Sequence, residues 1–135
     1  MSEYLFLYGT LKPNEAAVDV AKVVKSLRRV GPATVPGRLY DFGDYPGAIT
    51  DCNSAKKIHG DVFELPVEAH ASLHALDQYE EFDVNNPEQS LFLRKKVSAK
   101  LFDGRELNCW IYVYNKEPGK ARQITSGNYS QSKVA

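Results

Sequence analysis

Along most of the chain, hydrophobic residues either run without interruption or alternate with polar residues, and both patterns predict β-strands. The first run is aromatic or aliphatic at every position from residue 4 to residue 8, which is typical of a buried strand, and it stops at Gly9. Later, two alternating segments flank Asp103-Gly104, a dipeptide that strongly favours a tight β-hairpin. The strands expected from these patterns cover residues 4–8, short pieces of 33–50 separated by turns, 58–65, 91–102 and 105–114.

Two other segments carry hydrophobic residues at helical spacing. The first predicts a helix over residues 15–29 that ends at Gly31-Pro32, and the second predicts a helix over residues 66–78. Six strands and two helices without a repeating βαβ order predict an α+β fold, a small mixed, mainly antiparallel β-barrel with flanking helices. The residues expected on the hydrophobic face of the second helix are Val67, Ala71, His74 and Ala75, with Leu73 and Leu76 beside them.

Composition narrows the class of protein. A length of 135 residues suits one domain with a hydrophobic core, so we expect a single domain over residues 1–135 with a partly irregular tail from about residue 115. Because 17 basic and 17 acidic residues balance, a nucleic-acid-binding surface is not expected. No hydrophobic run reaches about 18 residues, so no membrane span is expected. Met1-Ser2-Glu3 lacks the basic segment of a secretion signal, and the two cysteines favour reduced thiols in a cytoplasmic protein.

Two short stretches are candidates for chemistry. After the first strand, Gly9-Thr10 can form a turn whose exposed N–H groups hold a small anion, although it can also be a plain strand end. Glu80-Glu81 lies between Tyr79 and Phe82, just past the second helix. Two adjacent acids are usually solvated. A carboxylate directed into an aromatic pocket would instead have a raised pKa and would be a good proton acceptor near neutral pH.

Metal and thiol chemistry are weaker candidates. His70 and His74 are four residues apart on the second predicted helix, and Asp77 could supply a third ligand. The zinc-protease pattern needs a Glu directly after the first His, whereas this chain has Ala71, so we expect no metal. No base can be identified near Cys52 or Cys109, and a thiol nucleophile is therefore not expected.

Eight short pieces of the chain, taken in order, resemble the gamma-glutamylcyclotransferase-like superfamily, in particular its short members related to avirulence-induced proteins. Each piece alone is unspecific, whereas the ordered set covers most of residues 4–129 and is specific. The pieces are Tyr8-Gly9-Thr10-Leu11, Gly37-Arg38-Leu39-Tyr40-Asp41, Tyr45-Pro46-Gly47-Ala48, Gly60-Asp61-Val62-Phe63-Glu64-Leu65, Leu76-Asp77-Gln78-Tyr79-Glu80, Ser90-Leu91-Phe92-Leu93-Arg94, Trp110-Ile111-Tyr112 and Ile124-Thr125-Ser126-Gly127-Asn128-Tyr129.

The resemblance implies a small mixed barrel with one cavity and a cofactor-independent reaction. In that reaction the α-amine of a γ-glutamyl group attacks its own side-chain carbonyl, which releases 5-oxoproline and an amine or amino acid. Glu80 is the implied catalytic acid/base, and the turn from Tyr8 to Leu11, with Gly9 and Thr10, is implied to bind the α-carboxylate of the substrate through N–H groups. Tyr45 and Tyr114 are further expected substrate contacts.

One departure from the family pattern concerns the residue after the catalytic acid. The family usually has Gly there, and this chain has Glu81, which either crowds the site or changes which leaving group is tolerated. The expected partner is a small γ-glutamyl compound, and amino acids, amines and a biosynthetic carrier all remain open as the leaving group. Two alternatives also stay open: a non-catalytic member that binds small carboxylates, and metal-dependent chemistry at His70, His74 and Asp77.

Overall fold

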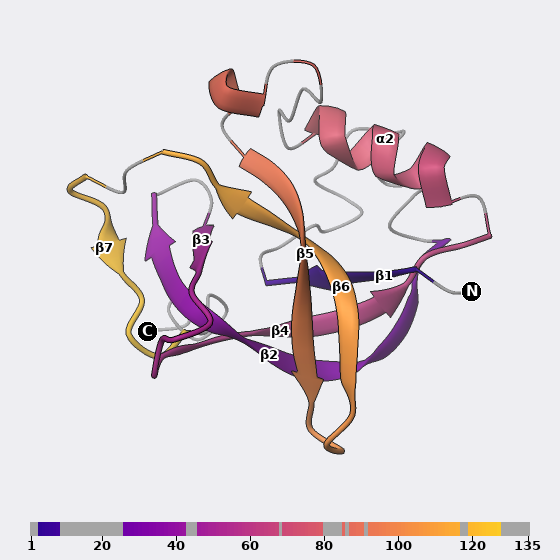
Figure 1. The fold of residues 1–135 in the computed structure, drawn as a ribbon, viewed down its shortest axis with the longest axis horizontal. Coiled ribbons are helices and arrows are strands. Elements are labelled where there is room, and N and C mark those ends of the chain that lie inside the picture. Colours follow the sequence, from indigo (N-terminus) through magenta and orange to yellow (C-terminus); the bar gives the residue numbers. More distant parts are fainter. Residues whose placement is uncertain are drawn as a thin grey trace.

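A computed structural model describes residues 3–8, 26–42, 46–67, 69–79, 85, 87–90, 92–116 and 119–127. Strands dominate this part of the chain, and one α-helix and one short 3-10 helix accompany them (Figure 1). The elements are β1 (Tyr4–Leu7), β2 (Arg28–Asp41), β3 (Pro46–Thr50), β4 (Lys57–Glu64), α2 (Ala69–Tyr79), η1 (Pro87–Gln89), β5 (Phe92–Leu101), β6 (Glu106–Tyr114) and β7 (Arg122–Gln123).

Five strands close into a barrel. Their hydrogen-bonded order is β2-β4-β1-β6-β5, and a further pairing of β5 with β2 completes the ring. The β1–β6 pairing is parallel and the other pairings are antiparallel. The short strands β3 and β7 extend the carboxyl-terminal half of β2 on its two sides. The predicted mixed, mainly antiparallel β-barrel is confirmed.

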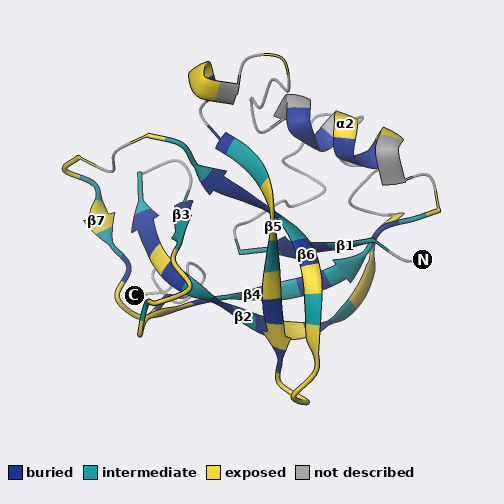
Figure 2. Cartoon of the chain, viewed as in Figure 1, coloured by how far each residue is buried: buried dark blue, intermediate teal, exposed yellow. Residues whose placement is uncertain are grey.

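Alternation of side chains along the strands separates the interior of the barrel from its outer surface. Figure 2 shows buried and exposed residues in turn along β2 and β5, and an exposed tip on the β5–β6 hairpin. The hairpin turns at Asp103-Gly104, as its sequence predicts. The interior contains Phe6, Ala33, Val35, Leu39, Ala48, Ile58, Val62, Ala99, Leu101, Cys109, Ile111, Val113 and Ile124.

The end of the first predicted helix is wrong. Ser26 is helical, but β2 already begins at Arg28 and runs through Gly31-Pro32 without a break. The cause is tertiary pairing, because Arg28 lies opposite Glu64 of β4 and Val35 faces the buried interior. Barrel burial therefore outweighs the local preference for a helix. Residues 15–25 of the predicted helix lie outside the described residues.

The predicted hydrophobic face of the second helix is correct for Leu73 and Leu76, which are buried, and wrong for three other residues. The helix begins at Ala69, Val67 before it is fully exposed, and Ala71 and His74 are exposed, whereas the side chain of Ala75 lies outside those that the structure describes. The buried positions are Ser72, Leu73, Leu76 and Asp77. The two leucines pack on the outer surface of the barrel in one cluster with Leu5, Leu65, Phe92 and Tyr112.

Asp77 anchors α2 to the β5–β6 hairpin. Its Oδ1 accepts hydrogen bonds from Arg94 Nε at 2.8 Å and from the Tyr112 hydroxyl at 2.6 Å, and its Oδ2 accepts from Arg94 Nη2 at 3.2 Å. The Arg94 guanidinium also lies 4.4 Å from the ring centroid of Trp110. Because the side chains of Asp77 and Arg94 are only 7% and 17% exposed, water screens this ion pair weakly.

Asp77→Asn is expected to destabilise the protein by about 3 kcal/mol, because it leaves the Arg94 guanidinium nearly buried and without a charged partner. Urea unfolding at pH 7 measures this free energy. A matched control is Asp61→Asn, which breaks the exposed Arg29–Asp61 pair and should cost about 1 kcal/mol or less. Equal losses in the two variants would contradict the anchoring role of Asp77.

Gly60→Ala is expected to destabilise the barrel by about 1–3 kcal/mol, because the added Cβ overpacks a closed interior. That Cβ would lie 2.4 Å from the Leu7 carbonyl oxygen and 2.7 Å from Phe6 Cζ. Gly31→Ala is the matched control in a neighbouring strand, since among the described residues its Cβ would meet only Leu101 Cδ2, at 4.0 Å. Thermal unfolding of both variants checks the prediction, and a tolerated Gly60→Ala would show that β1 and β4 can move apart.

Candidate functional site

Three elements of the described structure begin or end next to residues of the predicted site. β1 ends one residue before Tyr8, β3 begins at Pro46, and α2 ends at Tyr79. These are the points where the chain enters or leaves the predicted substrate-binding and catalytic segments. The predicted site residues Gly9, Thr10, Leu11, Tyr45, Glu80 and Glu81 themselves lie outside the described residues, so their predicted roles stay predictions.

Tyr8 ties the end of β1 to two other strands. Its hydroxyl donates a hydrogen bond to the Tyr112 carbonyl oxygen of β6 and accepts one from the Ala48 backbone N–H of β3 at 3.3 Å. The phenol therefore fixes the position from which residues 9–11 depart. The predicted substrate contact of Tyr8 is through the backbone of this turn, and that contact stays a prediction.

Tyr112 connects the end of β1 with the last turns of α2. Its carbonyl oxygen accepts from Tyr8, and its own hydroxyl donates to Asp77 at 2.6 Å. Tyr112 is 3% exposed, and its hydrogen bond to Asp77 is buried, whereas the one with Tyr8 is partly buried. Asp77 precedes Glu80 by three residues, and Tyr8 precedes Gly9 by one. The departure points of both predicted functional segments are thus held on one residue.

Sequence reasoning did not assign a role to Tyr112. A signal was present, because Trp110, Tyr112 and Tyr114 alternate on one face of β6 and a buried tyrosine hydroxyl needs a partner. The pattern could not identify that partner, since Asp77 is 35 residues away in the chain.

Tyr114 belongs to an aromatic cluster at the end of β6. Its ring stacks on Phe42 with a centroid separation of 4.2 Å and meets Phe92 edge-on at 5.7 Å. Gly47 permits this approach, because a Cβ at that position would lie 2.4 Å from the Phe42 ring. The cluster joins β3, the segment after β2, and both strands of the hairpin.

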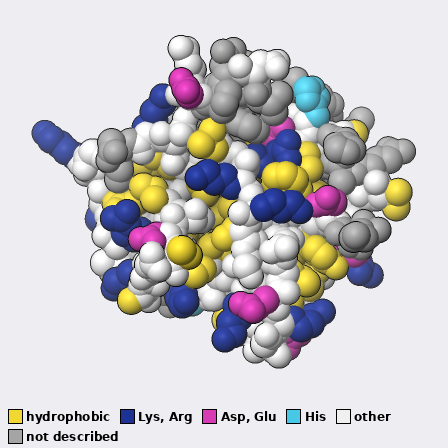
Figure 3. Space-filling view, viewed as in Figure 1, with side chains coloured by type: hydrophobic (Ala, Val, Ile, Leu, Met, Phe, Trp, Pro, Cys, Tyr) yellow, Lys and Arg dark blue, Asp and Glu magenta, His cyan; other side chains and the backbone are white. Residues whose placement is uncertain are grey.

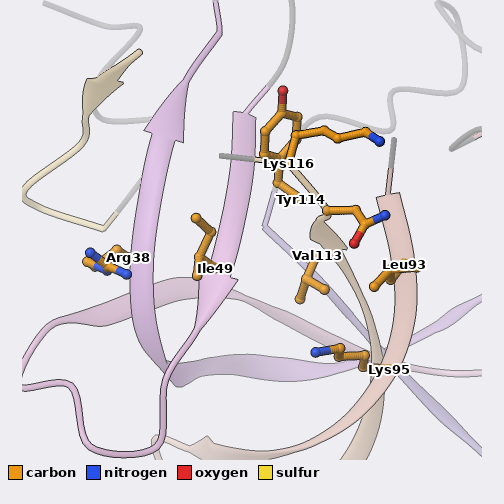
Figure 4. Close-up of a pocket in the computed structure, with 8 residues that line it drawn as sticks. Arg38, Ile49, Leu93, Lys95, Val113, Tyr114 and Lys116 are labelled. Carbon is orange, nitrogen blue, oxygen red and sulfur yellow. The ribbon is translucent and has the colours of Figure 1, made fainter. Parts of the chain in front are cut away.

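An open groove of about 540 Å³ lies between the β2–β3 pair and the β5–β6 hairpin. On the face of the molecule in Figure 3, basic side chains gather beside hydrophobic ones over β5 and β6. Figure 4 shows Ile49 on one side of the groove, Leu93 and Val113 on the other, and Tyr114 with Lys116 at one end. The lining residues are Arg38, Ile49, Leu93, Lys95, Val113, Tyr114, Asn115 and Lys116. Tyr114 lines this groove, and its predicted contact with substrate stays a prediction.

The two cysteines differ in environment. Cys52 is exposed and Cys109 is buried, and neither forms a disulfide. Burial raises the pKa of the Cys109 thiol to about 11, and the positive charge of Lys96 offsets part of that rise. A thiol with this pKa is neutral at pH 7 and is a poor nucleophile. Cys109 packs inside the barrel, which agrees with the expectation that it has no catalytic role.

Of the residues weighed as metal ligands, the side chain of His70 lies outside those that the structure describes. Asp77 is buried and accepts from Arg94 and Tyr112 with both carboxylate oxygens engaged, whereas His74 is exposed. Among the residues that the structure describes, no three His, Cys, Asp or Glu side chains group together to hold a metal ion. In the same part of the chain, no helix has the length and apolarity to cross a membrane.

Comparisons with solved structures place this fold among known ones. YkqA from Bacillus subtilis is 22% identical with a TM-score of 0.70, and the match covers 100% of this chain but only 44% of YkqA. An AIG2-like protein from Mus musculus is 17% identical with a TM-score of 0.62, over 87% of this chain and 80% of that protein. At these identities the likeness shows the fold alone.

Sequence comparisons identify the family. The Methanocaldococcus jannaschii protein named "Putative gamma-glutamylcyclotransferase MJ1514" is 22% identical over 127 residues, which are 94% of this chain and 95% of that protein. The family described as "Gamma-glutamyl cyclotransferase, AIG2-like" matches residues 5–131. This match covers both strands of the hairpin, α2 and every predicted site residue. The chain therefore belongs to the gamma-glutamyl cyclotransferase, AIG2-like family.

Proposed function

We propose that this protein is a cyclotransferase that converts a γ-glutamyl compound into 5-oxoproline and a free amine or amino acid, with Glu80 as the acid/base. The observation that carries the proposal is the convergence on Tyr112. This residue binds Tyr8, which directly precedes the predicted turn, through its carbonyl oxygen, and it binds Asp77, three residues before Glu80, through its hydroxyl. Family membership supports the same reaction.

The reaction depends more on the relative orientation of the two reacting groups of the substrate than on a reactive side chain of the protein. The α-nitrogen and the side-chain carbonyl belong to the same substrate molecule, and holding them in contact can supply about 7–11 kcal/mol in the best-organised cases. Backbone N–H groups of Gly9, Thr10 and Leu11 would bind the α-carboxylate and fold the chain of the substrate back on itself. The two hydrogen bonds of the Tyr8 hydroxyl fix the residue that directly precedes this proposed turn.

Glu80 would accept and donate the protons that are transferred in the reaction. The α-nitrogen is an ammonium at neutral pH and becomes nucleophilic only after it loses a proton to a base. Its attack on the side-chain carbonyl forms the lactam C–N bond, and the bond to the leaving nitrogen then breaks. Over the whole reaction two protons pass from the α-nitrogen to the leaving nitrogen, and no water is consumed. A carboxylate that accepts a proton and then donates it can serve both steps.

The proposed setting is the cytoplasm, with a small γ-glutamyl molecule as partner and no cofactor. Both cysteines carry free thiols, which supports a reducing compartment. The side chains of Tyr45, Glu81 and Tyr114 are proposed to surround the substrate, with Glu81 affecting which leaving group is accepted.

Glu80→Gln is expected to lower kcat for 5-oxoproline release by about 10²–10⁴-fold, because the amide cannot accept a proton. A panel of γ-glutamyl dipeptides and γ-glutamylamines, followed by chromatography of 5-oxoproline, measures the loss. Thermal unfolding should be unchanged, since the substitution preserves size.

Glu81→Gln is the matched control for the neighbouring acid and should keep turnover on at least one substrate of the panel. Full turnover in Glu80→Gln would remove Glu80 from the mechanism. Loss of turnover in Glu81→Gln alone would move the acid/base role to Glu81. A wild-type protein that binds 5-oxoproline but never forms it would favour a non-catalytic member.

A further inference from the structure

The groove between the β2–β3 pair and the β5–β6 hairpin has an unusual charge. Among the residues that the structure describes, its lining includes three basic side chains, those of Arg38, Lys95 and Lys116, and no acidic one. The protein as a whole has a formal net charge of zero, so this excess of positive charge is local. Hydrophobic side chains form the remaining walls beside Asn115, and apolar walls strengthen the field of nearby charges.

None of these three cations has an acidic partner within the described part of the chain. Arg38 and Lys95 form no ion pair there, and Lys116 Nζ donates only to a backbone oxygen, that of Glu88, at 3.3 Å. Most other described arginines, in contrast, have a carboxylate oxygen within 3.2 Å; these are Arg28, Arg29, Arg94, Arg105 and Arg122. Cationic side chains that have no carboxylate partner favour the binding of a negatively charged ligand in the groove.

The groove forms where β5 diverges from β2. The two strands pair only where Ala33 and Thr34 lie opposite Leu101 and Lys100, at the far end of β5. Nearer the start of β5, the strand continues to pair with β6, where Leu93 lies opposite Val113. In Figure 4 the amino group of Lys95 points into the space between β3 and β5.

One end of the groove is connected by side-chain contacts to α2, the helix that precedes Glu80 in the sequence. Tyr114 lines the groove and contacts Phe92 edge-on at 5.7 Å. Phe92 in turn packs in one cluster with Leu76 of α2, which precedes Glu80 by about one helical turn. Phe92 and Lys95 are three residues apart in β5, which corresponds to about 10 Å along the strand. Side-chain contacts through Phe92 therefore connect this end of the groove with Leu76 of α2.

We propose that this groove is a subsite for the leaving group of the substrate and that it selects leaving groups with two or more negative charges, such as an acidic amino acid or an acidic peptide. The inference rests on the proposed cyclotransferase function. A single carboxylate would leave most of the positive charge of the groove unmatched. An acidic residue supplies a second carboxylate beside its α-carboxylate, and its aliphatic stem can pack on Leu93 and Val113.

The test compares two isosteric substrates, γ-glutamyl-glutamate and γ-glutamyl-glutamine, which differ by one charge. The wild-type protein is expected to process the first with about tenfold higher kcat/KM, and the preference should shrink as salt is added. Arg38→Met and Lys95→Met should each reduce kcat/KM for γ-glutamyl-glutamate by about two- to fivefold and leave the glutamine substrate unchanged.

Lys100→Met is the matched control, because Lys100 is an exposed lysine of the same strand that lies outside the groove. It should leave both substrates unaffected. Equal kcat/KM for the two wild-type reactions, or equal losses in all three variants, would overturn the subsite while the cyclotransferase function stands.

A second arm does not depend on turnover. Titration of the wild-type protein with the dipeptide Glu-Glu, followed by backbone amide chemical shifts, should perturb Lys95 and Lys116, and Gln-Gln should perturb them much less. Absence of 5-oxoproline from every substrate would reject the proposed function. The titration would then test the proposed role of the groove independently of turnover. Equal chemical-shift changes with Glu-Glu and Gln-Gln, or none with either, would reject the subsite.

Discussion

The closure of the barrel by β2 is the constraint on which the rest of the structure depends. This strand spans 14 residues and pairs with β4 along its first part, with β5 at two positions, and with β3 and β7 near its end. A strand shared by four neighbours cannot shift register without turning its buried residues outward. The short β2–β5 pairing closes the barrel at one end, and the basic groove lies where the two strands diverge.

A second level of organisation joins the helix to this barrel. The outer surface of the β5–β6 hairpin presents Arg94 and Tyr112, and both bind Asp77 of α2. The same Tyr112 accepts a hydrogen bond from Tyr8. A substrate that must fold back on itself needs its anchor and its proton acceptor at a constant separation, because small misplacements are costly in rate. Shared attachment to one buried residue is a simple physical way to keep that separation constant.

Much of the fold can be predicted from the sequence, because strand alternation and the Asp103-Gly104 turn are local signals. The boundary at Arg28 and the buried face of α2 could not be predicted, since both depend on partners distant in the chain, Glu64 for the first and the β5–β6 hairpin for the second. Of the predicted site, the structure describes Tyr8, which is bound to β3 and β6, and Tyr114, which lines the groove. Tyr112 was missed because its importance lies in two long-range hydrogen bonds rather than in any motif.

The most direct measurement of the proposed chemistry is turnover of a γ-glutamyl substrate in water enriched in oxygen-18. Attack by the α-amine consumes no water, so the 5-oxoproline should carry no label and no glutamate should form. Labelled glutamate would mean that water, and not the α-amine, attacks the carbonyl. That result would contradict the intramolecular reaction and would make the protein a hydrolase.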